Sequence, residues 1–215
     1  MEEEQIQQED KKDETVHEDI ESTSEVHPLQ FSWSLWYSSS GKRLTFQSYE
    51  QSLKRVATFR TVEEFWGVFN HIPQPSQIAP KADFHIFKDG IEPKWEDPMN
   101  ESGGVWQVSF RRDPSAGNEA PINDAWFHTV LAIVGDNFEP AESDDIRGIA
   151  LAVRNKEYRL ALWTGTAEDK ELQEAIGRSF RKFATYSGTT IKESISFTSN
   201  KDALVDADAK PLYVV

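Results

Sequence analysis

The chain has 215 residues, enough for one sizeable domain with a tail, and it contains no cysteine, which excludes disulfides and zinc–thiolate sites. It has no run of 18 or more apolar residues, and Met1-Glu2-Glu3-Glu4 does not resemble a signal peptide, so we expect a soluble protein of the cytoplasm, with nuclear presence as a further option. The net charge of −14 repels a phosphate backbone, so any binding of nucleic acid should depend on one local pocket with a few placed cations.

Residues 1–26 differ from the rest of the chain in composition. They hold eleven acidic residues against Lys11 and Lys12, and they contain almost no aromatic or branched apolar side chains. A segment of this kind cannot bury enough apolar surface to offset the entropy of ordering it. The sequence therefore predicts a disordered acidic tail over 1–26 and one folded domain over 27–215.

The first half of the domain combines an alternating segment with a capped helix. Residues 31–37 place aromatic and leucine side chains at every second position, which is typical of a strand. Thr61 and Glu64 have the spacing of a capping box, which predicts a short helix that ends near Asn70. Several prolines then separate this helix from a predicted strand over 84–87.

The second half of the domain contains, in order, a strand, a helix, a hairpin, a helix and a strand. We expect these at 105–110, 123–134, 146–154 paired with 158–164, 167–183 and 191–197. Gly135 is placed to cap the C-terminus of the first of these helices. Because strands outnumber helices and the turns are short, the sequence predicts an α+β fold with antiparallel strands and with helices packed on one face of the sheet.

The hairpin over 146–164 predicts what each face of the sheet does. Alternation places large aliphatic side chains on one face, where they can bury against helices: Ile149, Leu151, Val153, Leu160 and Leu162. The other face receives Ala150, Ala152, Arg154, Arg159, Ala161 and Trp163. Small side chains beside two arginines and an indole leave room for a ligand, so we expect a binding site on that face.

Trp95 and Glu96 lie side by side in a segment bounded by Gly90, Pro93 and Pro98. The electron-rich face of an indole attracts a planar cation, and a carboxylate accepts hydrogen bonds from N–H groups on the edge of such a ligand. A positively charged purine needs both groups at once, and 7-methylguanine is one. Taken alone, the pair is also compatible with a buried tryptophan beside a surface acid.

The wider pattern resembles the eukaryotic translation initiation factor 4E family. The matching motifs follow the family's order and spacing over nearly all of 27–215: His27-Pro28-Leu29-Gln30, Thr61-Val62-Glu63-Glu64-Phe65-Trp66, Phe87-Lys88-Asp89-Gly90-Ile91-Glu92-Pro93, Trp95-Glu96-Asp97, Gly103-Gly104-Val105-Trp106 and Ile176-Gly177-Arg178. The resemblance implies a curved antiparallel sheet of about eight strands backed by three helices on its convex face. It also implies that the 7-methylguanosine cap of mRNA binds on the concave face.

In such a fold the cap base would lie between Trp95 and a second aromatic ring, with Glu96 accepting hydrogen bonds from the guanine. Tyr49 fits the second position when the count runs back from the helix, and Phe46 fits when it runs forward from the start of the domain. We favour Tyr49, because 47–51 also resembles the branch called the 4E-homologous protein, where this ring is a tyrosine. Either residue replaces the family's usual tryptophan, which should weaken the stack.

The resemblance also assigns residues to the rest of the cap. Arg154 and Arg159 would contact the phosphates, with Lys156 at the turn as a weaker candidate, and Trp163 would contact the N7-methyl group. The alternation of the hairpin independently places both arginines on the expected ligand face. The other interpretation of these three basic residues is an exposed hairpin tip with no ligand.

A second surface is implied on the helix that begins at Val62. In the family, an exposed dorsal patch receives a helical peptide of the Tyr-x-x-x-x-Leu-apolar type, carried by the 4G-type initiation scaffold and by inhibitory 4E-binding proteins. By position this dorsal patch comprises His27, Pro28, Val62, Trp66, Phe127, Leu131 and Gly135. Phe127 and His128 replace the usual Leu-Glu pair, so the choice of partner can differ. Burial of Val62 and Trp66 in the core is the alternative.

Nothing in the sequence favours catalysis. The five histidines lie in no nucleophile motif, and neither metal-ligand spacing nor a glycine-rich phosphate loop is present. We therefore expect a protein without enzymatic activity, cofactor or metal, which binds capped mRNA and recruits the initiation scaffold. Two alternatives stay open: a repressor of the 4E-homologous type, which recruits the scaffold poorly, and a protein-interaction module that does not bind the cap.

Overall fold

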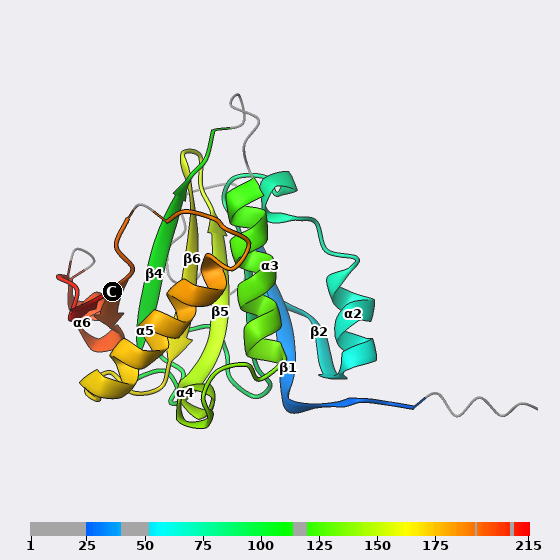
Figure 1. The fold of residues 1–215 in the computed structure, drawn as a ribbon, viewed down its shortest axis with the longest axis horizontal. Helices are drawn as coiled ribbons and strands as arrows, with labels where there is room; N and C mark the ends of the chain where they lie inside the picture. The colour runs from blue at the N-terminus through cyan, green and yellow to red at the C-terminus, as the bar shows by residue number, and fades with distance from the viewer. Residues whose placement is uncertain (1–24, 40–51, 114–119, 192, 207–208) are drawn as a thin grey trace, which may run out of the picture.

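The computed structural model describes residues 25–39, 52–113, 120–191, 193–206 and 209–215. Most of the predicted tail therefore lies outside the described residues. Within them, eight strands form one antiparallel sheet in the order β2-β1-β3-β5-β6-β4-β7-β8 (Figure 1). The strands are β1 (Pro28–Ser39), β2 (Lys54–Thr61), β3 (Ala82–Lys88), β4 (Gly104–Arg111), β5 (Ile146–Val153), β6 (Glu157–Thr164), β7 (Ser196–Ser199) and β8 (Tyr213–Val214).

The helices of the described residues lie against this curved sheet. They are α2 (Val62–Phe69), α3 (Ala120–Val134), α4 (Pro140–Asp145), α5 (Lys170–Ala184) and α6 (Asn200–Val205), with one 3-10 turn, η1 (Pro75–Gln77). Figure 1 shows α3 and α5 crossing one face of the sheet, while α2 lies beside β2 at its edge. The predicted α+β fold with an antiparallel sheet of about eight strands is confirmed, and the three predicted helices correspond to α2, α3 and α5.

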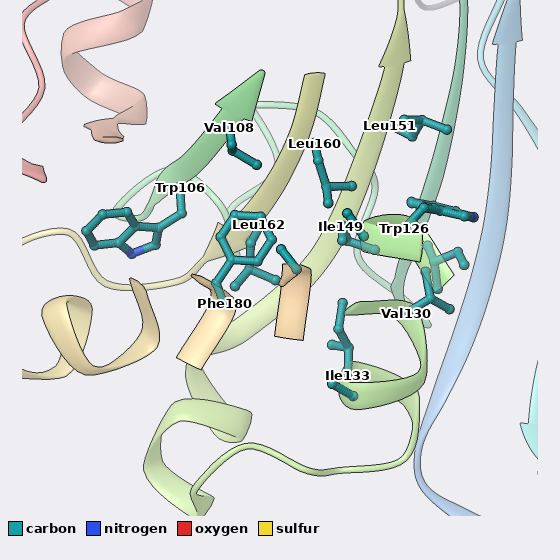
Figure 2. Close-up of a cluster of buried hydrophobic side chains, with 14 of the residues drawn as sticks. Trp106, Val108, Trp126, Val130, Ile133, Ile149, Leu151, Leu160, Leu162 and Phe180 are labelled. Atoms are coloured by element: carbon teal, nitrogen blue, oxygen red, sulfur yellow. The ribbon is translucent and has the colours of Figure 1, made fainter. Parts of the chain in front are cut away.

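The main core fills the space between the sheet and these helices. Figure 2 shows aliphatic side chains of β5 and β6 in the same cluster as side chains of α3 and α5: Ile149, Leu151, Leu160, Leu162, Trp126, Val130, Ile133 and Phe180. Trp106 of β4 is fully buried there, and its indole N–H donates to Gln173 Oε1 of α5 over 3.1 Å. The predicted division of the hairpin into a core face and a second face is therefore confirmed.

Side-chain caps fix where two of the helices begin. Thr61 Oγ1 accepts from the backbone N–H of Glu64 at 3.1 Å, which is the first bond of the predicted capping box. The return bond from the Glu64 side chain reaches the residue before the N-cap: Glu64 Oε2 accepts from the backbone N–H of Arg60 at 2.8 Å. Asp169 accepts from the backbone N–H of Leu172 and starts α5 at Lys170. The helix predicted from 167 therefore begins three residues later.

The residue predicted to cap the C-terminus of α3, Gly135, was wrong by one position. Asp136, not Gly135, has the left-handed backbone, with a φ of 54°. The N–H of Asn137 donates to the carbonyl of Ala132 at 2.8 Å, and that of Asp136 donates to the carbonyl of Ile133 at 3.3 Å, which is the bonding of a Schellman motif. Asp tolerates this conformation better than most residues, so a glycine is not required at Asp136.

Two strand predictions also need correction. No strand was predicted over Lys54–Thr61, where β2 pairs with β1 as an edge strand and buries only Phe59 fully. The strand predicted over 191–197 begins only at Ser196. Ile191 and Ile195 are both buried. Ile195 exchanges two backbone hydrogen bonds with Val215, at 3.1 and 3.0 Å, which continue the pairing of β7 with β8, whereas Ile191 packs without belonging to a strand.

We expect Gly177→Ala to destabilise the fold by about 1–3 kcal/mol, because a Cβ there would lie 2.7 Å from the ring of Trp106, which is enclosed and cannot move aside. Gly67→Ala, in α2, is the matched control: a Cβ there meets nothing within 4 Å, so it should stabilise by about 0.4–1 kcal/mol. Urea denaturation measures both. Equal effects of the two substitutions would contradict this account of the α5–β4 contact.

Candidate nucleotide-binding face

The face of the sheet away from α3 and α5, here called the concave face, carries a second and smaller apolar cluster. Phe87, Ile91, Ala150 and Trp163 are buried together there, separately from the main core. Ala150 is in register with Ala161 on the neighbouring strand, and Gly148 is in register with Trp163. A Cβ on Gly148 would lie 2.5 Å from the Phe87 ring, so glycine allows Phe87 and Trp163 to meet at 5.5 Å between ring centroids.

A loop over 89–103 reaches this face and is held by its own polar side chains. Asn100 is fully buried, and its side-chain amide donates to the carbonyls of Glu92 and Lys94 at 2.9 and 2.8 Å. Asp97 accepts from the backbone N–H groups of Glu92 and Met99, both at 2.9 Å. These bonds replace the ladder that a strand would provide, so the loop has a defined shape without regular secondary structure.

The braced loop presents Trp95 and Glu96 at its surface. Trp95 is 40% exposed, although large aromatic side chains are normally well covered. Glu96 is exposed, and among the described residues its carboxylate has no hydrogen-bond or ion-pair partner. The alternative of a buried tryptophan is thus excluded, and both groups are available to a ligand.

Two arginines lie on the concave face at the hairpin end of β5 and β6. Arg154 forms an ion pair with Asp83 of β3 at 2.5 Å, and Arg159 forms one with Glu157 at 2.5 Å. Both guanidinium groups stay partly exposed, and Lys156 is exposed at the turn. The arginines are therefore oriented by acids rather than free, and an anion would have to share them.

His85 of β3 is a further polar group on this face that the sequence did not single out. It is 5% exposed, and among the described residues neither ring nitrogen has a hydrogen-bond partner. Burial lowers the pKa of His85 to about 4; Asp83 opposes this shift and Arg154 adds to it. Its neighbours Phe84 and Ile86 are in the core, so the alternation of β3 is the sequence signal that could have placed His85 on the face opposite the helices.

The dorsal patch lies on the other side of the molecule, across α2 and α3. Val62 and Phe127 are each 37% exposed, whereas Trp66 and Leu131 are half-buried. Trp66 packs against Phe65 and Phe69 and lies 6.4 Å from Phe127 between ring centroids. The side chains of the patch are thus partly exposed and packed against one another, and Val62 and Trp66 are not buried in the core.

The first segment of the domain is tied to this patch. The carbonyl of His27 accepts from the backbone N–H of Val62 at 2.9 Å, and His27 Nδ1 lies 2.6 Å from the Glu63 carboxylate. The hydrogen bond with the His27 side chain is the main cause that lowers the pKa of Glu63 to about 2. Pro28 and Gly135 are also exposed, so all seven predicted patch residues reach the surface at least in part.

Not every predicted site residue can be placed. Tyr49 and Phe46 lie outside the described residues. Two hollows of about 420 and 610 Å³ flank β1, but none of the residues predicted to contact the cap lines either of them. The described part of the chain shows no group of three or more His, Asp or Glu side chains that could hold a metal ion. Within the same ranges, no helix is long and apolar enough to cross a bilayer.

Comparison with known proteins decides the family. The model of eukaryotic initiation factor 4E matches residues 28–212. The chain belongs to the eukaryotic initiation factor 4E family. It is 38% identical over 190 residues to factor 4E-1 of Solanum lycopersicum, which covers 88% of this chain and 76% of the relative. With factor 4E-1 of Zea mays it shares 38% identity over 191 residues, or 88% and 81% of the two chains.

Solved structures of factor 4E proteins share the fold. The complex of C. elegans eIF4E-3 with the 4E-binding protein Mextli and a cap analog superimposes with a TM-score of 0.77 at 30% identity, covering 89% of this chain and all of the other. Ascaris suum eIF4E-3 with an m2,2,7G cap gives 0.77 at 31% identity, covering 89% and 99%. Factor 4E proteins bind ligands and are not enzymes, so the expectation of no catalysis agrees with the family.

Because burial lowers the pKa of His85 in the folded protein, stability should depend on pH in a range that begins near pH 6.5, above the ordinary pKa of the carboxylates. Between pH 6.5 and about 4 the unfolded chain binds a proton at this histidine that the folded chain does not, so stability is lost as the pH is lowered through this range, by at most about 3 kcal/mol. The Glu63 contribution is lost at lower pH, between pH 4.5 and about 2, and overlaps the His85 range only near pH 4. Denaturation midpoints across pH 4–7 measure the effect.

His85→Phe is the control for this pH dependence. The variant has no imidazole to protonate, so the part of the slope between pH 6.5 and 4 that comes from this site should disappear. If the wild type and the variant lose stability in parallel over that range, another group causes the dependence.

Proposed function

We propose that this protein binds the 7-methylguanosine 5′ cap of mRNA on its concave face and recruits a translation initiation scaffold through its dorsal patch. The observation that carries the proposal is the loop over 89–103, which is braced from within and presents an exposed indole beside a carboxylate that has no partner among the described residues. The structures it resembles include complexes of Ascaris suum eIF4E-3 with m7G and m2,2,7G caps. A role in translation favours the cytoplasm as its compartment, with nuclear presence as a further option.

The base would stack on Trp95, while Glu96 accepts from the guanine N1–H and N2–H groups. A bidentate contact of this kind contributes roughly 1–3 kcal/mol of discrimination between bases. Methylation at N7 makes the base cationic, and a desolvated cation–π contact adds about 2 kcal/mol over plain guanosine. Trp163 would contact the methyl group, and Tyr49, or Phe46 in its place, would supply the second ring.

Arg154 and Arg159 would contact the cap phosphates, with Lys156 adding charge from the turn. The ion pairs with Asp83 and Glu157 support this role, because they hold each guanidinium in place before the ligand arrives. The same acids compete with the phosphates, so we expect a moderate electrostatic contribution. That contribution should decrease as the salt concentration rises.

Glu96→Ala should weaken binding of 7-methylguanosine triphosphate at least tenfold, about 1.4 kcal/mol, and should remove the preference for it over 7-methyladenosine triphosphate. The reason is that the change deletes an exposed acceptor pair and no packing. Calorimetric titration measures both ligands.

Glu101→Ala is the matched control, since Glu101 is an exposed acid in the same loop and this substitution removes the same negative charge. Its affinity should stay within twofold of the wild type. Retention of full guanine preference by Glu96→Ala would show that another group reads the base.

The dorsal patch would receive a helical peptide of the Tyr-x-x-x-x-Leu-apolar type from a 4G-type scaffold or an inhibitory 4E-binding protein. Support comes from the exposed apolar groups Val62 and Phe127 and from the half-buried Trp66 between them. The C. elegans and Schistosome relatives were solved in complex with the 4E-binding protein Mextli and with a 4E-BP. Aromatic anchors dominate such interfaces, at 2 kcal/mol or more.

Trp66→Ala should separate the two surfaces. Since Trp66 also packs on Phe65 and Phe69, we expect some loss of stability, but retention on cap-analogue resin should survive. Binding of the peptide should drop tenfold or more, as measured by fluorescence anisotropy. Leu204→Ala is the control, because Leu204 is an exposed apolar residue on α6. Joint loss of cap and peptide binding in Trp66→Ala would contradict separate surfaces.

Two other functions lead to different outcomes in the same assays. A repressor of the 4E-homologous type would bind the cap but bind the scaffold peptide poorly, and the tyrosine at position 49 is the feature that favours it. A pure interaction module would bind the peptide and not the cap analogue. The exposed carboxylate of Glu96, which no described residue pairs with, favours cap binding over this second alternative.

A further inference from the structure

On the concave face, His85 occupies the middle of three rows of side chains that run across the sheet. It is in register with Trp36 on β1 and with Ala150 on β5. One row away, Phe87 is in register with Gly148, which is in register with Trp163. One row in the opposite direction, Asp83 is in register with Ala152, which is in register with Arg159. Each step along β3 is two residues, or roughly 7 Å.

The polar atoms of His85 have no partners within the described part of the chain. Both ring nitrogens are buried and unpaired, and so are the indole N–H groups of Trp36 and Trp163 on the same face. A buried polar group without a hydrogen bond costs about 1–3 kcal/mol, and such groups call for a specific reason. A strand position beside Phe84 and Ile86 could hold an apolar residue without that cost.

The side chains in the two outer rows indicate which part of a bound nucleotide would lie beside His85. The proposed contacts to the methylated base come from Trp163, Trp95 and Glu96, whereas the proposed phosphate contacts come from Arg154 and Arg159. In a nucleotide the ribose joins the base to the phosphates. The neighbours of His85 along its row toward β6 are the small side chains of Ala150 and Ala161, and a larger residue at either position would obstruct a sugar there.

We propose that His85 is a specificity-determining residue that hydrogen-bonds the 2′,3′-diol of the cap ribose. This inference rests on the proposed function. A neutral imidazole carries one N–H donor and one acceptor, and each ribose hydroxyl can both donate and accept. The side chain would then recognise ribose by the same logic by which Glu96 recognises guanine, and a deoxy sugar would leave its nitrogens unpaired in the complex.

The test compares 7-methylguanosine triphosphate with its 2′,3′-dideoxy analogue by calorimetric titration. The wild type should bind the dideoxy analogue at least fivefold more weakly. In His85→Phe, which keeps an aromatic ring and removes both nitrogens, the ratio of the two affinities should fall to within twofold. His85→Ala should give the same result and serves if the phenylalanine variant does not fold.

Gln107→Ala is the matched control, because Gln107 is an exposed polar residue in register with Ala161 in the same row. It should keep the wild-type ratio. Equal binding of both ligands by the wild type, or an unchanged ratio in both His85 variants, would overturn the role of His85 while leaving cap binding intact. Failure of the wild type to bind either ligand would instead contradict the proposed function.

Discussion

The pairing of β5 with β6 is the constraint on which the rest of the structure depends. Ile149 is in register with Leu162 and Leu151 with Leu160, so the large aliphatic side chains meet α3 and α5 on one face. The same register aligns Ala150 with Ala161 and Ala152 with Arg159 on the other face. A slip of one residue would exchange the two sets, burying an arginine under the helices. One pairing thus sets both the core and the site.

Long-range hydrogen bonds attach the loop over 89–103 to this frame. The side chain of Asn200, at the start of α6, donates to the carbonyl of Asn100 at 2.7 Å, and its backbone N–H donates to the carbonyl of Gly103. At the other end, Ser34 of β1 donates to Asp89 at 2.7 Å. The loop is therefore anchored to elements from both ends of the chain, so the position of Trp95 depends on contacts with β1 and α6 as well as on the loop itself.

The sequence was informative wherever the structure depends on a short repeating pattern. The alternation in the hairpin identified which residues face the helices, and the Thr61–Glu64 spacing located the start of α2. Prediction was poorer where tertiary contacts decide: β2 has a charged outer side and one large buried residue, Phe59, so its alternation is weak. The strand predicted before β7 was too long: Ile195 still pairs with Val215, but Ile191 packs into the core outside any strand.

The site divides in the same way. The shared face of Arg154 and Arg159 could be predicted from the alternation of the hairpin, and Trp95 and Glu96 stood out as a candidate pair because they lie within a recognisable motif. The positions of Asp83 and His85 beside them could not be predicted, because they depend on β3 lying beside β5, a pairing between distant segments that one sequence does not reveal. The bracing role of Asn100 depends on its burial beneath the loop, which likewise appears only in three dimensions.

The central claim is that the two faces of the sheet have separate functions, and the tryptophans of this chain report on both. Titration with 7-methylguanosine triphosphate, followed through the indole N–H signals in nitrogen-15 NMR spectra, tests it most directly. We expect the signals of Trp95 and Trp163 to shift, while those of Trp66 on the dorsal patch and of Trp106 in the core stay in place. Shifts at Trp66 with Trp95 and Trp163 unchanged would place the ligand on the helix side and contradict the account.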